Sequence, residues 1–85
     1  MSRYTKTHPK EAHLRIAYGY DFPQQAYFYG IFDSTKEDEN GDEKIVSDLE
    51  KYFVGCSRNE LFEKLQEFEA PEKHTSMVAL DLPIE

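Results

Sequence analysis

Residues 14–33, LRIAYGYDFPQQAYFYGIFD, decide the fold of this chain. The first part alternates large apolar side chains with smaller or polar ones, which is the period-2 pattern of a half-buried strand. Pro23 then interrupts the pattern, because proline cannot donate to a ladder. The aromatic residues that follow favour a second strand over residues 26–33. Two strands joined by this short connection predict an antiparallel hairpin.

The second strand of this hairpin is apolar on both faces. Tyr27, Tyr29 and Ile31 alternate with Phe28 and Phe32. A domain this small rarely has enough helix to cover both faces, so we predict that the phenylalanine side is the core. Tyr27, Tyr29 and Ile31 are then predicted to stay accessible and to bind a partner. Packing of the tyrosines inside the core is the alternative interpretation.

The clearest helix signal begins at Ser57. Ser57 and Glu60 have the spacing of a capping box, in which each side chain accepts a hydrogen bond from the other residue's backbone N–H. The pattern predicts a helix over residues 57–68. Its apolar face consists of Leu61, Phe62, Leu65 and Phe68.

Two segments leave their secondary structure open. Residues 44–53 carry apolar side chains at helical spacing, but they follow the turn signal Asn40-Gly41 and so also suit a third strand. Pro71 suits the first turn of a helix, which predicts a short helix over 71–80. The alternation of apolar residues over 78–82 would instead suit a strand.

These elements predict a single α+β domain over residues 13–85, with a small antiparallel sheet of two or three strands packed against two or three helices. A length of 85 residues fits one domain of this kind. Residues 1–12 are polar and interrupted by Pro9, so we predict a flexible N-terminal tail there.

Composition restricts the partners and the compartment. A net charge of −7 disfavours phosphate backbones and anionic lipids, so we expect neither nucleic acid nor a membrane as partner. The charge is uneven, because residues 1–15 carry four basic side chains against Glu11 alone, whereas residues 33–50 are strongly acidic. Cys56 is the single cysteine and the first residues lack the apolar run of a signal peptide, so a cytoplasmic location is expected.

The acidic segment over residues 34–43 invites a calcium interpretation. Asp38 and Asn40 match two ligand positions of an EF-hand loop, but Lys36 and Ser47 then stand where carboxylates are needed. The histidines also lack the spacings of zinc sites. The sequence therefore predicts neither a metal nor a cofactor, and a solvated loop for this segment.

Cys56 is the one candidate for reactive chemistry. It precedes the start of the predicted helix over 57–68, where the helix dipole lowers the pKa of a thiol. It also occupies the hydrophobic-staple position, which favours a small buried side chain.

Three short runs resemble a family of small bacterial proteins of uncharacterised activity. They are RIAYGYDFP at residues 15–23, the pair Tyr27-Phe28, and ALDLP at residues 79–83. The resemblance implies a bacterial origin and carries over no catalytic residue. The resemblance adds nothing about mechanism. The residue patterns alone leave an enzyme uncertain and favour a noncatalytic protein-interaction module that binds a protein partner or itself. A small redox-sensitive or enzymatic factor using Cys56 and an acidic mimic of nucleic acid are the alternatives.

Overall fold

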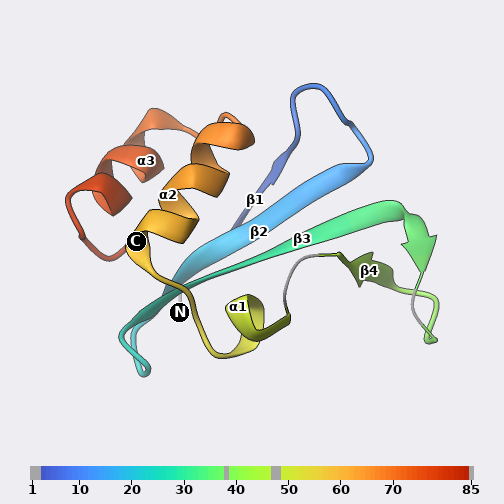
Figure 1. Ribbon diagram of the computed structural model, residues 1–85, viewed down its shortest axis with the longest axis horizontal. Helices are drawn as coiled ribbons and strands as arrows, with labels where there is room; N and C mark the ends of the chain where they lie inside the picture. The colour runs from blue at the N-terminus through green and yellow to red at the C-terminus, as the bar shows by residue number, and fades with distance from the viewer. Residues whose placement is uncertain (1–2, 38, 47–48, 85) are drawn as a thin grey trace.

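The computed structural model describes residues 3–37, 39–46 and 49–84. These residues form an α+β fold, with a four-stranded antiparallel sheet in the order β1-β2-β3-β4 and three helices (Figure 1). The strands are β1 (Tyr4–Thr7), β2 (Leu14–Asp21), β3 (Ala26–Glu37) and β4 (Glu43–Ile45), and the helices are α1 (Leu49–Phe53), α2 (Arg58–Glu67) and α3 (Glu72–Ala79).

The predicted hairpin is confirmed, because β2 pairs with β3 from Leu14 opposite Asp33 to Asp21 opposite Ala26. The sheet nevertheless has four strands rather than two or three. One additional strand, β1, comes from the segment that the sequence analysis assigns to the tail. Tyr4 turns toward the helices, and its ring lies 4.2 Å from the His74 ring between centroids. Burial of this single aromatic side chain helps to hold a four-residue polar strand on the sheet.

Helices α2 and α3 lie on one face of the sheet, and α1 lies on the other (Figure 1). The core fills the space between the sheet and the α2–α3 pair. It extends to the end of the described chain, because Tyr27 donates a hydrogen bond from its hydroxyl to the Leu82 carbonyl at 2.7 Å and Ile84 is fully buried. The core residues are Ile16, Tyr18, Tyr27, Tyr29, Ile31, Leu61, Leu65, Phe68, Val78 and Ile84.

The capping box at the start of α2 is confirmed. The Ser57 hydroxyl accepts from the Glu60 backbone N–H, and the Glu60 carboxylate accepts from the Ser57 backbone N–H, each at 3.2 Å. The predicted C-terminal helix is also confirmed as α3, with Pro71 as its N-cap residue.

The segment over residues 44–53 contains both of the predicted alternatives. Its first residues belong to β4, which continues the meander, and its last residues form α1. Residues 47 and 48 lie outside the described part of the chain, and so does Asp38 of the EF-hand comparison. None of the helices in the described ranges has the length and apolar character needed to cross a lipid bilayer.

Candidate interaction surface

The sequence-predicted partner residues lie in the core. Tyr27, Tyr29 and Ile31 have exposed fractions of 5%, 6% and 9%, so the prediction that they are accessible is wrong. The physical reason is that α2 and α3 pack on their side of the sheet. The chain therefore covers both faces of β3, and the face that it covers less completely is the one that carries Phe28 and Phe32.

Helix α1 covers that second face through one residue, Tyr52. The Tyr52 ring lies over Gly30 so closely that a Cβ atom built on Gly30 would stand 2.6 Å from its Cδ2 atom. The same ring meets Phe28 and Phe32 edge-on, with centroids 5.9 and 5.8 Å away. Because Gly30 has no side chain, the Tyr52 ring of α1 can pack directly on the backbone of β3 at this position.

The segments on either side of α1 are fixed to the backbone of β3. The Val46 N–H donates to the Ile31 carbonyl at 2.8 Å, and the Cys56 N–H donates to the Tyr27 carbonyl at 2.8 Å. Gly55 connects α1 to the second bond with a φ of +124°, a conformation that favours glycine. These bonds place α1 across β3.

The outward side of α1 and Val54, the residue that follows it, are apolar and exposed. Phe53 and Val54 have exposed fractions of 64% and 63%, and Leu49 is exposed as well. No residue of α1 is fully buried. Leu49, Phe53 and Val54 are called the α1 patch below. Apolar side chains grouped in this way on a small domain are typical of an interaction site.

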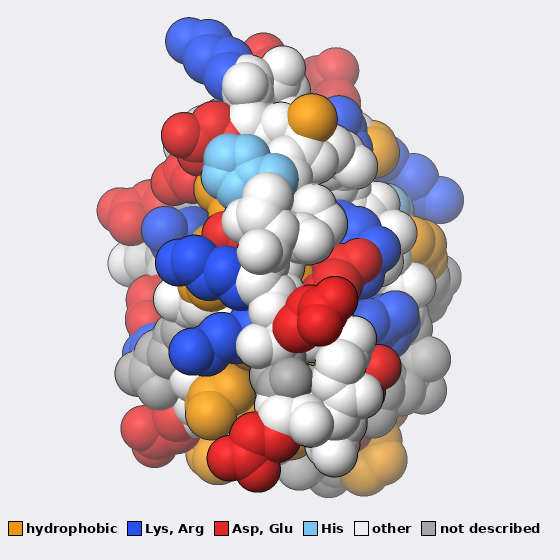
Figure 2. Space-filling view, turned by 90° about the vertical axis from the view of Figure 1, so that its right-hand side faces the viewer, with side chains coloured by type: hydrophobic (Ala, Val, Ile, Leu, Met, Phe, Trp, Pro, Cys, Tyr) orange, Lys and Arg blue, Asp and Glu red, His pale blue; other side chains and the backbone are white. Residues whose placement is uncertain are grey.

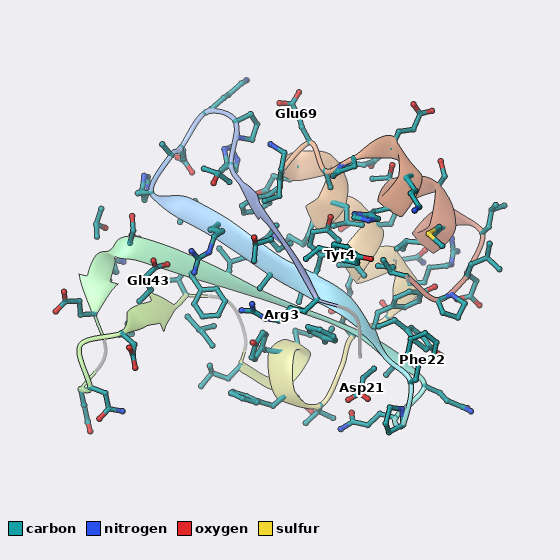
Figure 3. The ribbon with its side chains drawn as sticks, turned by 180° about the vertical axis from the view of Figure 1, so that it is seen from behind. Arg3, Tyr4, Asp21, Phe22, Glu43 and Glu69 are labelled. Carbon is teal, nitrogen blue, oxygen red and sulfur yellow. The ribbon has the colours of Figure 1, made fainter. Side chains whose placement is uncertain are left out.

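A cavity of about 260 Å³ lies beside the α1 patch. We call it the α1 cavity, and its apolar walls include Phe28, Tyr52 and Phe53. Its charged lining residues are Arg3 and Asp21, which Figure 3 shows beside α1. Arg3 forms no ion pair with any residue that the structure describes, so its charge is available to a ligand.

The sequence contained a signal for this surface. Phe53 and Val54 are consecutive apolar residues in a segment that the helical pattern covers only in part, and they are followed by Gly55. Together with Tyr52 they make three consecutive large apolar residues, which span about 200° around a helix and cannot all face the sheet. The sequence does not reveal the position of Arg3, because it predicts residues 1–12 to be a flexible tail with no fixed place near α1.

Cys56 is not an activated thiol. Burial raises its pKa to about 12, and the nearby Glu60 carboxylate acts in the same direction. The thiol is therefore protonated near neutral pH, which disfavours nucleophilic or redox chemistry. Its side chain packs against the core, as the staple interpretation predicted.

The end of the sheet where β3 connects to β4 does not carry negative charge alone. Figure 2 shows basic and acidic side chains interspersed on this side of the molecule. Glu43 pairs with Arg15 at 3.1 Å, and Asp33 accepts hydrogen bonds from Thr35 that lower the pKa of its carboxyl group. Within residues 3–37, 39–46 and 49–84, no three His, Cys, Asp or Glu side chains converge as a metal site would require.

One buried polar pair remains on the helix side of the sheet. The Tyr18 hydroxyl and the His74 Nδ1 atom are 2.6 Å apart, and the Tyr4 ring packs against the His74 ring in a tilted arrangement. Burial raises the pKa of Tyr18 to about 12 and lowers the pKa of His74 below its usual value. Both groups are therefore neutral near pH 7, and the pair joins β2 to α3 as a structural hydrogen bond.

Comparisons of this chain with protein-family models, with curated proteins and with solved structures find no match.

Proposed function

We propose that this chain is a noncatalytic protein-interaction module of a bacterial cytoplasm, and that it binds a segment of a partner protein through the α1 patch and the α1 cavity. The observation that carries the proposal is the exposure of Phe53 and Val54 next to a cavity with apolar walls, which Asp21 and Arg3 also line; Arg3 forms no ion pair within the described ranges. The sequence resemblance supports the bacterial setting, and the lone Cys56 is in keeping with a reducing compartment.

The chemistry of the cavity specifies the partner segment. Phe28, Tyr52 and Phe53 offer aromatic surface to an apolar side chain of the partner, which would gain free energy by leaving water. The Arg3 guanidinium offers paired N–H donors to a carboxylate. The partner segment should therefore combine an apolar residue with a neighbouring Asp or Glu.

The pKa directions support a binding role over a catalytic one. The thiol of Cys56 stays protonated, and the imidazole of His74 is enclosed by aromatic side chains on the helix side of the sheet. Neither group lines the α1 cavity. The alternative that uses Cys56 as a reactive thiol therefore has no supporting observation.

Selection from a library of random displayed peptides on the full chain tests the proposal. We expect the selected peptides to pair an aromatic or aliphatic residue with an acidic one. Phe53→Ser should weaken their binding at least about tenfold, as loss of a central aromatic contact does at other interfaces. Arg3→Gln should weaken peptides that contain an acidic residue more than matched peptides in which it is replaced by Gln or Asn.

Leu80→Ser is the matched control, because Leu80 is 70% exposed but lies at the end of α3 and outside the α1 cavity. It should leave peptide binding unchanged. The proposal fails if the selection yields no saturable binder, or if the selected peptides bind Phe53→Ser as well as they bind the unsubstituted chain.

A further inference from the structure

Strand β1 is one of the two edge strands of the sheet, and its register shows which backbone groups face outward. The His8 N–H donates to the Leu14 carbonyl at 2.9 Å, and β1 pairs with β2 from Tyr4 opposite Tyr18 to Thr7 opposite Arg15. Because hydrogen-bonded pairs alternate along an antiparallel ladder, the backbone groups of Tyr4 and Lys6 point toward β2. The N–H and C=O groups of Thr5 and Thr7 therefore point away from the sheet.

The inward side chains of β1 hold this edge in place. The Tyr4 ring packs at a tilt of 43° against His74 of α3, and His8 meets Phe68 edge-on with centroids 4.9 Å apart. Thr5 and Thr7 are exposed. In Figure 3, β1 is seen from behind as it runs along the outside of β2. The edge is thus a fixed row of backbone donors and acceptors, which is a template for another strand.

The edge is also basic, in a chain whose net charge is −7. Residues 3–10 contain Arg3, Lys6 and Lys10 and no Asp or Glu. None of the three cations forms an ion pair with a residue in the described ranges. Lys6 donates a hydrogen bond to the neighbouring Thr7 carbonyl, at 3.3 Å. An incoming strand would meet positive charge beside both faces and beyond the end of β1.

We propose that β1 accepts an extended acidic segment of a partner protein as a fifth strand of the sheet. This inference rests on the proposed function and names its binding mode and the charge of the partner. The two surfaces are continuous, because Arg3 stands at the start of β1 and also lines the α1 cavity. A segment that pairs with Thr5 and Thr7 continues past Arg3 to the cavity, where its apolar residue enters.

A second copy of the chain is the less suitable occupant of this edge. Two β1 edges that pair antiparallel would bring Arg3 and Lys6 of one copy close to the same residues of the other. Like charges placed across a strand pair are destabilising. Acidic side chains at those positions would instead be attracted.

The probe is a synthetic peptide of eight alternating Glu and Val residues with both ends capped, added to the isotope-labelled full chain and followed by NMR. We expect saturable shifts at the amides of Thr5 and Thr7. A matched peptide of alternating Lys and Val should bind at least about tenfold more weakly, because its charge is reversed. Binding of the acidic peptide should weaken as salt is added.

Two changes remove the backbone contacts alone. Thr5→Pro deletes the outward N–H and leaves the bonds to β2, so it should reduce the affinity at least about tenfold, whereas Thr5→Val keeps the N–H and should bind like the unsubstituted chain. If Thr5→Pro prevents folding, an acidic peptide N-methylated at alternate residues gives the same test from the ligand side. Only one of the two methylation registers removes the donors that face β1, so one register should abolish binding and the other should preserve it.

The inference is overturned if the acidic and basic peptides bind equally, if neither binds, or if both methylation registers retain the affinity. It is also overturned if the chain alone forms a dimer that Thr5→Pro dissociates, since a second copy is then the occupant. Selected peptides that depend on Phe53 but ignore Thr5→Pro would leave the proposed function standing without strand addition. Peptides whose binding is weakened by Thr5→Pro but not by Phe53→Ser would support strand addition at β1 and contradict binding at the α1 patch.

Discussion

Replacement of Gly30 by alanine tests the placement of α1 on the sheet. The new Cβ atom would stand 2.6 Å from Cδ2 and 3.1 Å from Cγ of Tyr52, so the ring has to move. The shifted atoms lie near the base of the ring, where rotation of the side chain alone gives little relief. Overpacking of this kind destabilises by about 1–3 kcal/mol, and we expect about 2 kcal/mol for Gly30→Ala.

The same substitution should be harmless once the ring is gone. Gly30 has no positive φ, so alanine adopts its backbone conformation without strain. In a Tyr52→Ala background, Gly30→Ala should be neutral or stabilise the fold by about 0.5 kcal/mol, because alanine restricts the unfolded chain. The coupling energy of the cycle is then about 2 kcal/mol, which is within the range for residues in direct contact.

Urea denaturation followed by far-ultraviolet circular dichroism measures all four corners of this cycle, since the chain has no Trp for fluorescence. Leu80→Ala provides a control background in which Gly30→Ala should keep its full effect, because Leu80 is 70% exposed, lies at the end of α3 and is not among the atoms nearest to Gly30. If Gly30→Ala destabilised the Tyr52→Ala chain as much as the unsubstituted one, Tyr52 would not lie on Gly30 and the position of α1 would be wrong.

Three further predictions concern other parts of the fold. Ser57→Ala removes the acceptor of the capping box and should reduce the free energy of unfolding by about 1 kcal/mol, seen as a lower urea midpoint. Burial lowers the pKa of His74, and the nearby Lys73 charge adds to this effect, so the neutral imidazole is favoured in the folded state. The stability contributed by neutral His74 is therefore present above its unfolded pKa of about 6.5 and is lost as the pH falls toward the folded pKa. The His74→Gln variant should accordingly lose less stability between about pH 7 and pH 5 than the unsubstituted chain does, as measured by thermal unfolding. Because burial raises the pKa of Cys56 to about 12, its alkylation in the folded chain should be at least about tenfold slower than in urea, by mass spectrometry at a mildly alkaline pH.

Local signals in the sequence were sufficient for the hairpin and for α2. The alternation before Pro23 and the Ser57–Glu60 spacing are each consistent with the final packing, so local preference and tertiary structure agree there. The same holds for Pro71, whose fixed φ suits the start of α3.

The remaining features depend on contacts between distant residues. β1 is too short and polar to be recognised alone, and its burial relies on the contact between Tyr4 and His74, 70 positions along the chain. The two faces of β3 could not be ranked, because both are apolar and the sequence does not tell which helix covers which face. The contact of the Tyr52 ring with Gly30 shows that α1 covers the phenylalanine face, and this contact is visible only in the structure. The candidate interaction surface was missed for the same reason, since it joins Arg3 to α1.

The contacts of Leu82 and Ile84 with the core have a consequence for folding during synthesis. Tyr27 donates to the carbonyl of Leu82, and Ile84 is enclosed by the core, so segments from the first third of the domain wait for residues at its far end. Domains made on the ribosome fold as units once their residues have emerged. We expect β2 to pair with β3 early, whereas the core can be completed only after residue 84 has left the exit tunnel. A proteolytic cut that removes those few residues would reopen the same interior after synthesis.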